Sequence, residues 1–286
     1  MDGRGPGIKK RRNDMKAKMK RLRILPLWLT LLLGGGCEYF EVHPYDTDVE
    51  GPVNTNAVNA LRIESALLDR SDYRFAVISD TQGRYDETEE AVAALNARGD
   101  LDFVLHCGDL SDFGLKKEFQ FQRDILNRLT MPCIALIGNH DCLATGQEVF
   151  QRIFGETNFA FTAGDTRFIC LNTNAMEYDY SVPVPDFDFM EHQLTHLPPG
   201  VVRAVWVMHV RPGEFQFNNN VKKAFEYYIL RSPGLPFCLY GHEHTARVDD
   251  LFGDGVLYYQ CPDIGKRTYL LFTMHETGYE YETVVF

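Results

Sequence analysis

The sequence predicts an α/β protein, because short apolar runs and helical patterns alternate along most of the chain. The apolar runs are rich in β-branched residues, and the segments between them place apolar residues at helical spacing. Strands are predicted at 74–79, 101–107, 133–138, 167–173, 202–209, 236–240, 256–260 and 268–273. Helices are predicted at 87–97, 116–129, 146–154, 186–197 and 221–230. This alternation favours a mostly parallel sheet in the first part of the fold.

The two ends of this pattern differ from its middle. Near the C-terminus, VLYYQ, RTYLLFTMH and GYEYETVVF follow one another with no helical segment between them, which predicts an antiparallel meander. Before the first strand, apolar residues at helical spacing predict a short helix over Asn56–Leu68. With 45% hydrophobic and 24% charged residues the chain is typical of globular proteins, and we expect one domain over residues 57–286.

Residues 1–36 have the organisation of a signal peptide. A basic stretch ends at Arg23, and the thirteen-residue run ILPLWLTLLLGGG is shorter than the ~20 residues of a membrane-spanning helix. Small residues directly before a cysteine resemble a bacterial lipoprotein signal and imply lipidation of Cys37, although Gly34 replaces the usual Leu. Glu38, rather than Asp, then favours export to an outer-membrane anchor. An ordinary secretory signal or a single membrane anchor is the alternative, and residues 37–56 are expected to form a polar tether.

Charge is distributed unevenly between this leader and the rest of the chain. The first 36 residues hold ten of the 29 Lys and Arg residues but only two of the 40 Asp and Glu residues. The remainder therefore has 19 basic and 38 acidic residues. Such an acidic body repels phosphate backbones, which argues against nucleic acid as a partner.

The six cysteines after Cys37 do not form a C-x-x-C pair, so a thiolate zinc site is not expected. Outside the cytoplasm a disulfide can form, but the spacing does not select its partners. Those cysteines that lie in strand-like runs are expected to be buried as small apolar side chains. They are Cys107, Cys133, Cys170 and Cys238.

Polar side chains follow five of the predicted strands. In open α/β sheets, ligands bind beyond the carboxyl ends of the strands, so these side chains are expected to converge. Carboxylate, amide and imidazole groups together suit Zn, Fe, Mn or Mg. In chain order they are Asp80 and Gln82, then Asp109 and Asp112, then Asn139, His140 and Asp141, then His209, and finally His242 and His244.

The motifs SDTQ, GDLSD, GNHD, the single His209 and GHEH resemble the five blocks of the calcineurin-like metallophosphoesterase superfamily. Their order and spacing match over most of the chain after the tether. The resemblance implies a four-layer αββα sandwich of two mixed β-sheets flanked by helices. It also implies a metal-dependent phosphoric ester hydrolase with two divalent ions, of Mn, Fe, Zn or Mg.

The same resemblance implies a role for each motif residue. One ion would be held by Asp80, position 82, Asp109 and His244, and the second by Asn139, His209 and His242, with Asp109 shared. His140 would lie near the leaving group, Asp141 would orient His140, and Asp112 would support the site from behind the ligands. A hydroxide between the ions would attack a phosphomonoester or phosphodiester.

Gln82 departs from the family pattern, which usually has His at this position. Three interpretations stay open. The amide oxygen ligates the first ion, or the amide binds a metal-bound water, or the first ion is weakly held or lost.

Substrate recognition is less well defined by the sequence. Arg211 follows His209 closely and is a candidate contact for the phosphate of a small phosphoester. An alternative function is a non-catalytic lipoprotein that binds a metal or ligand on the same fold. Because His140, Asn139 and Asp109 are all present, the sequence favours the enzyme.

Overall fold

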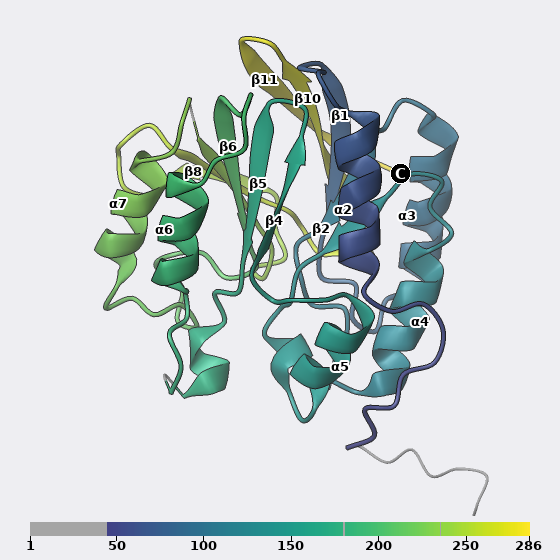
Figure 1. Cartoon of the computed structure of the whole chain (residues 1–286). Coiled ribbons are helices and arrows are strands. Elements are labelled where there is room, and N and C mark those ends of the chain that lie inside the picture. Colours follow the sequence, from purple (N-terminus) through teal and green to yellow (C-terminus); the bar gives the residue numbers. More distant parts are fainter. Residues whose placement is uncertain (1–44, 180, 235) are drawn as a thin grey trace, which may run out of the picture. The chain divides into compact units, whose positions relative to one another are not determined.

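Two mixed β-sheets face each other and carry helices on their outer sides (Figure 1). The computed structural model describes residues 45–179, 181–234 and 236–286. The predicted signal peptide, the lipidation site Cys37 and the start of the tether lie outside these residues and stay predictions. Within the described ranges, no helix combines the length and the hydropathy required to cross a bilayer.

The first sheet has the strand order β11-β10-β1-β2-β3. β1, β2 and β3 are parallel, β10 is antiparallel to β1, and β11 is antiparallel to β10. Phe75 of β1 lies opposite Phe103 on one side and Phe272 on the other. The strands are β1 (Tyr73–Ile78), β2 (Phe103–His106), β3 (Cys133–Ala135), β10 (Thr268–His275) and β11 (Gly278–Val285).

The second sheet has the order β4-β5-β6-β7-β9-β8. Its four central strands are parallel, and β4 and β8 are antiparallel edge strands. The strands are β4 (Phe159–Ala163), β5 (Thr166–Leu171), β6 (Arg203–Met208), β7 (Phe237–Tyr240), β8 (Arg247–Asp250) and β9 (Leu257–Gln260).

Three features of the sheets differ from the sequence prediction. The edge strands β4 and β8 were not predicted. The prediction of a C-terminal meander is wrong for the first of its three strands. β9 pairs with β7 in the second sheet, whereas β10 and β11 pair with each other in the first. The turn at Ile264–Lys266 carries the chain from one sheet to the other, which consecutive apolar runs do not reveal.

Helices cover the outer face of each sheet, so the four-layer αββα arrangement is confirmed (Figure 1). α3 buries Ala91, Val92 and Leu95 against the first sheet, and α7 buries Phe225 and Ile229 against the second. α2 contacts the edge strands β3 and β4 of both sheets. The helices are α2 (Thr55–Ala66), α3 (Tyr85–Arg98), α4 (Lys116–Leu126), α5 (Gly146–Ile153), α6 (Phe187–Thr195) and α7 (Lys222–Leu230).

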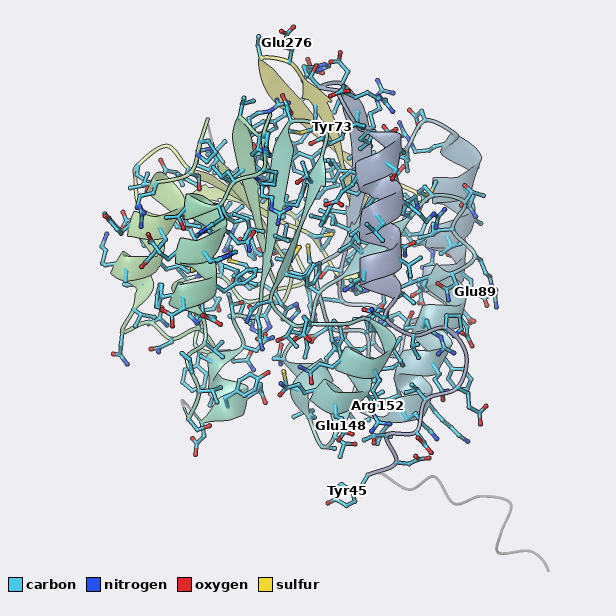
Figure 2. The ribbon with its side chains drawn as sticks, viewed as in Figure 1. Tyr45, Tyr73, Glu89, Glu148, Arg152 and Glu276 are labelled. Carbon is cyan, nitrogen blue, oxygen red and sulfur yellow. The ribbon has the colours of Figure 1, made fainter. Side chains whose placement is uncertain are left out.

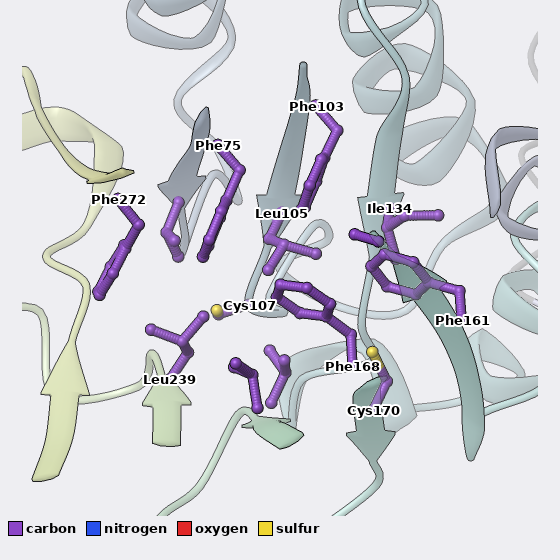
Figure 3. Packing of buried hydrophobic residues seen from close by; sticks show 14 of the residues in the cluster. Phe75, Phe103, Leu105, Cys107, Ile134, Phe161, Phe168, Cys170, Leu239 and Phe272 are labelled. Carbon is purple, nitrogen blue, oxygen red and sulfur yellow. The ribbon is translucent and has the colours of Figure 1, made fainter. Parts of the chain in front are cut away.

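Aromatic rings fill the space between the sheets (Figure 3). The ring of Phe75 stacks on Phe103 and Phe272 with centroids 5.0 and 5.1 Å apart, and it meets Phe168 of the opposite sheet edge-on at 5.3 Å. Such pairs add to the stabilisation that burial provides. Cys107 and Cys170 lie in this core as free thiols, and Cys238 is buried as expected, whereas Cys133 is half-buried.

The segment before α2 packs on the domain. The guanidinium of Arg123 donates to the main-chain carbonyls of Glu50 and Pro52. Arg152 on α5 pairs with Asp48 at 3.5 Å. Arg152 also pairs with Glu148, one helical turn away (Figure 2). In α2, the buried amide of Asn56 donates to and accepts from the main chain of Ala135. Among the described residues, part of the predicted tether between Asp48 and Asn56 therefore already packs on the domain.

Candidate metal centre

The predicted site residues lie at the carboxyl ends of β1, β2 and β3 of one sheet and of β6 and β7 of the other. Contacts between the sheets hold these ends together. His209 Nδ1 donates to the Cys107 carbonyl at 2.7 Å, and the main-chain N–H of His242 donates to Asp80 Oδ2 at 3.2 Å. Five strands from two sheets thus deliver their polar ends to one place.

One group of donors surrounds the carboxylate of Asp109. The ligand atoms of Asp109, His209 and His242 lie within 4.8 Å of one another. Asn139 Oδ1 lies 3.0 Å from His209 Nε2 and 3.1 Å from His242 Nδ1, and Asp109 Oδ2 lies 3.2 Å from His209 Nε2. Two imidazoles, an amide oxygen and a carboxylate form a donor set that suits a divalent transition metal.

A second group of donors also adjoins Asp109 through Gln82. His244 Nε2 is 3.2 Å from Asp80 Oδ1, and Gln82 Nε2 is 3.4 Å from Asp109 Oδ2. Gln82 Oε1 is a buried oxygen without a hydrogen-bond partner. Because such an atom loses its hydration on burial, a cation beside it compensates the cost, and the residues present fit a metal here.

The buried histidines have different proton affinities. Burial opposes the charge of His209, but the carboxylate of Asp109, 3.2 Å away, raises the pKa of His209 to about 9. Burial, together with the charge of His209, lowers the pKa of His242 to about 4. The hydrogen bond from His209 Nδ1 to Cys107 directs its Nε2 toward Asp109 and Asn139, as is common for metal-binding histidines.

Backbone strain is concentrated at the same place. Four predicted ligands have a positive φ: Asp80 (53°), Asp109 (61°), His242 (75°) and His244 (60°). This conformation is uncommon for residues other than glycine and clusters at functional sites. Gly138 allows the loops to approach, because a Cβ atom there would lie 2.1 Å from Asp109 Oδ1.

The environment of Asp141 differs from the expectation that this residue orients His140. Its fully buried carboxylate accepts hydrogen bonds from the loop after β2 and from Gly138. His140 Nδ1 instead contacts the main-chain carbonyl of Asp112 at 2.9 Å. Asp141 therefore holds the metal-site loops, and Asp112 contributes its carbonyl group. The donors to Asp141 are the N–H groups of Asp109 (3.0 Å), Leu110 (2.9 Å), Ser111 (2.8 Å) and Gly138 (2.9 Å), with the Ser111 hydroxyl (3.1 Å).

Residues 73–246, well over half of the chain, match the family model described as calcineurin-like phosphoesterase. The chain belongs to the calcineurin-like phosphoesterase family. This membership confirms the resemblance of the motifs, and it supports the expectation of a metal-dependent phosphoester hydrolase.

Several known proteins are similar to this calcineurin-like phosphoesterase. A 3′,5′-cyclic-nucleotide phosphodiesterase of Nostoc sp. is 26% identical in an alignment of length 159 that covers 51% of this chain and 57% of that protein. A purple acid phosphatase from yellow lupin (Lupinus luteus) seeds has a TM-score of 0.55 at 15% identity, over 74% of this chain and 51% of that one. GAP50, the anchor in the inner membrane complex of Plasmodium, has a TM-score of 0.55 at 11% identity, over 76% and 85%. The two structures show a shared fold.

Arg211 of this phosphoesterase is already paired. Its Nε atom lies 2.7 Å from Glu243 Oε2, its Nη2 atom lies 2.6 Å from Glu214, and only 13% of its side chain is exposed. Glu243 stands between His242 and His244, so this ion pair joins the loop after β6 to the histidines after β7. A phosphate contact of Arg211 therefore stays a prediction and would compete with two carboxylates.

Sequence reasoning missed one more acidic residue near the centre. Glu177 follows β5, and Gln216 Nε2 donates to its Oε1 at 3.3 Å. Burial raises the pKa of Glu177, His140 lowers it, and Asp109 raises it, which places the carboxylate in the field of both site residues. The position of Glu177 after a predicted strand was the sequence feature that could have indicated it as a site residue.

The substitution Gln82→His tests whether Gln82 helps to hold the first of the two predicted ions. Imidazole is the stronger ligand for Zn, Fe or Mn, so we expect the more weakly bound ion to bind about tenfold tighter, about 1.4 kcal/mol. Titration calorimetry and metal content per chain measure this, with Gln82→Ala as the matched loss of the ligand. Equal affinities in all three proteins would show that Gln82 does not ligate the ion.

Proposed function

We propose that this protein hydrolyses a phosphomonoester or phosphodiester with the help of two divalent metal ions. One observation carries the proposal: oxygen and nitrogen donors from five strand ends gather around Asp109, and the buried Gln82 Oε1 has no hydrogen-bond partner. Folding alone does not stabilise such an arrangement, and four of its residues are held in a strained backbone conformation.

The donor groups suggest how the ions would be divided. Asp80, Gln82 and His244 would hold one ion, Asn139, His209 and His242 would hold the other, and Asp109 would contact both. When bound, such ions neutralise the charge of the phosphate oxygens and lower the pKa of a water molecule that attacks phosphorus. The identity of the metal among Mn, Fe, Zn and Mg is left to experiment.

His140 is the candidate general acid. Its Nδ1 atom donates to the carbonyl of Asp112, which leaves Nε2 as the atom that can face the substrate. A protonated Nε2 can donate a hydrogen bond or a proton to the leaving oxygen as the phosphorus–oxygen bond breaks. The main-chain N–H of His140 donates to Asp109 Oδ1 at 3.0 Å, so the acid is fixed relative to the centre.

A phosphodiester is the preferred substrate class within this proposal, because the similar protein of Nostoc sp. is named as a phosphodiesterase.

The proposal also includes export of the protein from the cytoplasm. The basic leader and the small residues before Cys37 support export and a lipid anchor, with the outer membrane as the site of anchoring. Labelling with a radioactive fatty acid, lost in Cys37→Ala, would test the anchor.

Activity of the full-length protein tests the proposed reaction. Bis-p-nitrophenyl phosphate and p-nitrophenyl phosphate are supplied with Mn²⁺, Mg²⁺, Zn²⁺ or Fe²⁺, and we expect metal-dependent release of nitrophenol. His140→Ala is expected to lower kcat by about 10²–10⁴-fold, the usual contribution of a general acid, with metal content unchanged. Absence of hydrolysis with every metal would favour the non-catalytic binding protein instead.

A further inference from the structure

Four exposed apolar side chains lie on loops that follow strands β2, β3, β5 and β6, at the same ends of the strands as the metal centre. The exposed fractions are 64% for Phe113, 37% for Leu143, 40% for Met176 and 76% for Phe215. We call these four side chains the apolar rim. Three of these loops also carry Asp109, Asn139 or His209. The same loops therefore position the apolar rim and the metal centre.

Contacts between neighbouring loops connect the four segments that carry the rim. Gly114, next to Phe113, packs so closely on the following loop that a Cβ atom would lie 2.0 Å from the Leu143 carbonyl oxygen. The main-chain N–H of Met176 donates to the carbonyl of Gln216, next to Phe215, at 3.2 Å. Tyr178 and Cys142 bring the two halves together, with Oη and Sγ 3.7 Å apart. The rim is thus positioned by the fold before any ligand binds.

The rim also adjoins His140. Asp112, whose carbonyl contacts His140 Nδ1, directly precedes Phe113. The main-chain N–H of Leu143 donates to the carbonyl of His140 at 3.2 Å. Two rim residues are therefore anchored to the immediate surroundings of the candidate general acid.

Single exposed apolar side chains are ordinary, but four on connected loops beside a polar site are an arrangement typical of ligand sites. Ligand sites typically combine apolar walls with a few polar groups that fix orientation. The chain has 40 acidic and 29 basic residues, so its charge does not favour docking on an anionic membrane.

We propose that the apolar rim binds the apolar part of the substrate, so that the preferred substrate is a phosphoester that carries an alkyl chain or an aromatic ring. This inference rests on the proposed phosphoesterase function. Glu177, held by Gln216 close to Met176, adds a hydrogen-bond acceptor at the same edge of the site.

Two diesters with the same leaving group test the rim. Octyl p-nitrophenyl phosphate, below its micelle concentration, and methyl p-nitrophenyl phosphate differ only in the chain. We expect kcat/KM to be about tenfold or more higher for the octyl ester, the scale of burying part of an alkyl chain. In the double variant Phe113→Ser, Phe215→Ser this ratio is expected to fall to about one. Leu61→Ser, which alters a 65% exposed side chain on α2, should leave the ratio unchanged.

Binding of octylphosphonate and methylphosphonate, measured by calorimetry, provides a readout that does not need turnover. We expect octylphosphonate to bind about tenfold tighter, and the double variant to lose the difference. If both esters are hydrolysed with equal kcat/KM and both phosphonates bind equally, the inference is wrong and the proposed function stands. If neither ester is hydrolysed, the proposed function fails and the phosphonates alone decide the role of the rim. The inference would also be overturned if the protein bound phosphatidylcholine vesicles through the rim and showed no preference between octyl and methyl compounds. The rim would then be a membrane-binding surface.

Discussion

Asp109→Asn is expected to lower kcat/KM by about 10³-fold or more, which corresponds to about 4 kcal/mol of transition-state stabilisation. The carboxylate lies 3.2 Å from His209 Nε2 and 3.4 Å from Gln82 Nε2, so both donor groups converge on it. Asparagine keeps the volume and can still accept from the N–H of His140, but it removes the charge that both ions would share. We therefore expect the metal content per chain to fall together with activity.

Asp100→Asn is the control for this substitution. Asp100 forms ion pairs with Arg74 and Arg98 at the surface, away from the strand ends that form the centre. It is expected to keep both activity and metal content, because surface ion pairs contribute little. Activity of Asp109→Asn within tenfold of the unaltered protein, with two ions still bound, would contradict the shared role of this carboxylate.

Asp141→Asn is expected to lower the free energy of unfolding of the metal-free protein by about 2–4 kcal/mol. Both oxygens of Asp141 accept main-chain N–H groups, and an amide NH₂ in place of one oxygen would face donors. Burial and the neighbouring charge of Asp109 raise the pKa of Asp141 to about 7, so removal of its charge offsets part of this loss. Urea denaturation at neutral pH measures the difference.

His140→Ala separates this structural role from catalysis. His140 is only partly buried, and its replacement leaves the bonds to Asp141 in place, so stability is expected to change by less than about 1 kcal/mol. If Asp141→Asn were as stable as the unaltered protein and lost activity like His140→Ala, Asp141 would instead act on His140.

The polar ends of five strands and the class of the fold could be predicted from the sequence, because both depend on local patterns. An apolar run followed by a turn and a carboxylate or histidine is recognisable within a few residues, as in FAVISD and FCLYGH. The order in which the strands pair within each sheet was harder to predict from the sequence. β8 has the polar sequence RVDD on an exposed edge and shows no apolar run. β4 does have an apolar run, FAFTA, and the Gly164-Asp165 turn between it and β5 is a hairpin signal that the sequence prediction missed.

What the sequence by itself determined is the set of side chains and their order along the chain. Only the tertiary structure decided their partners, because these lie on different strands and in different sheets. His209 is oriented by a carbonyl 102 residues away, and Asp141 binds the loop of Asp109 rather than its neighbour His140. The apolar rim has the same origin, since its four residues are distant in sequence and meet only where the loops pack together. Local periodicity carries no record of such contacts, because hydrogen bonds and close packing depend on where strands end in space.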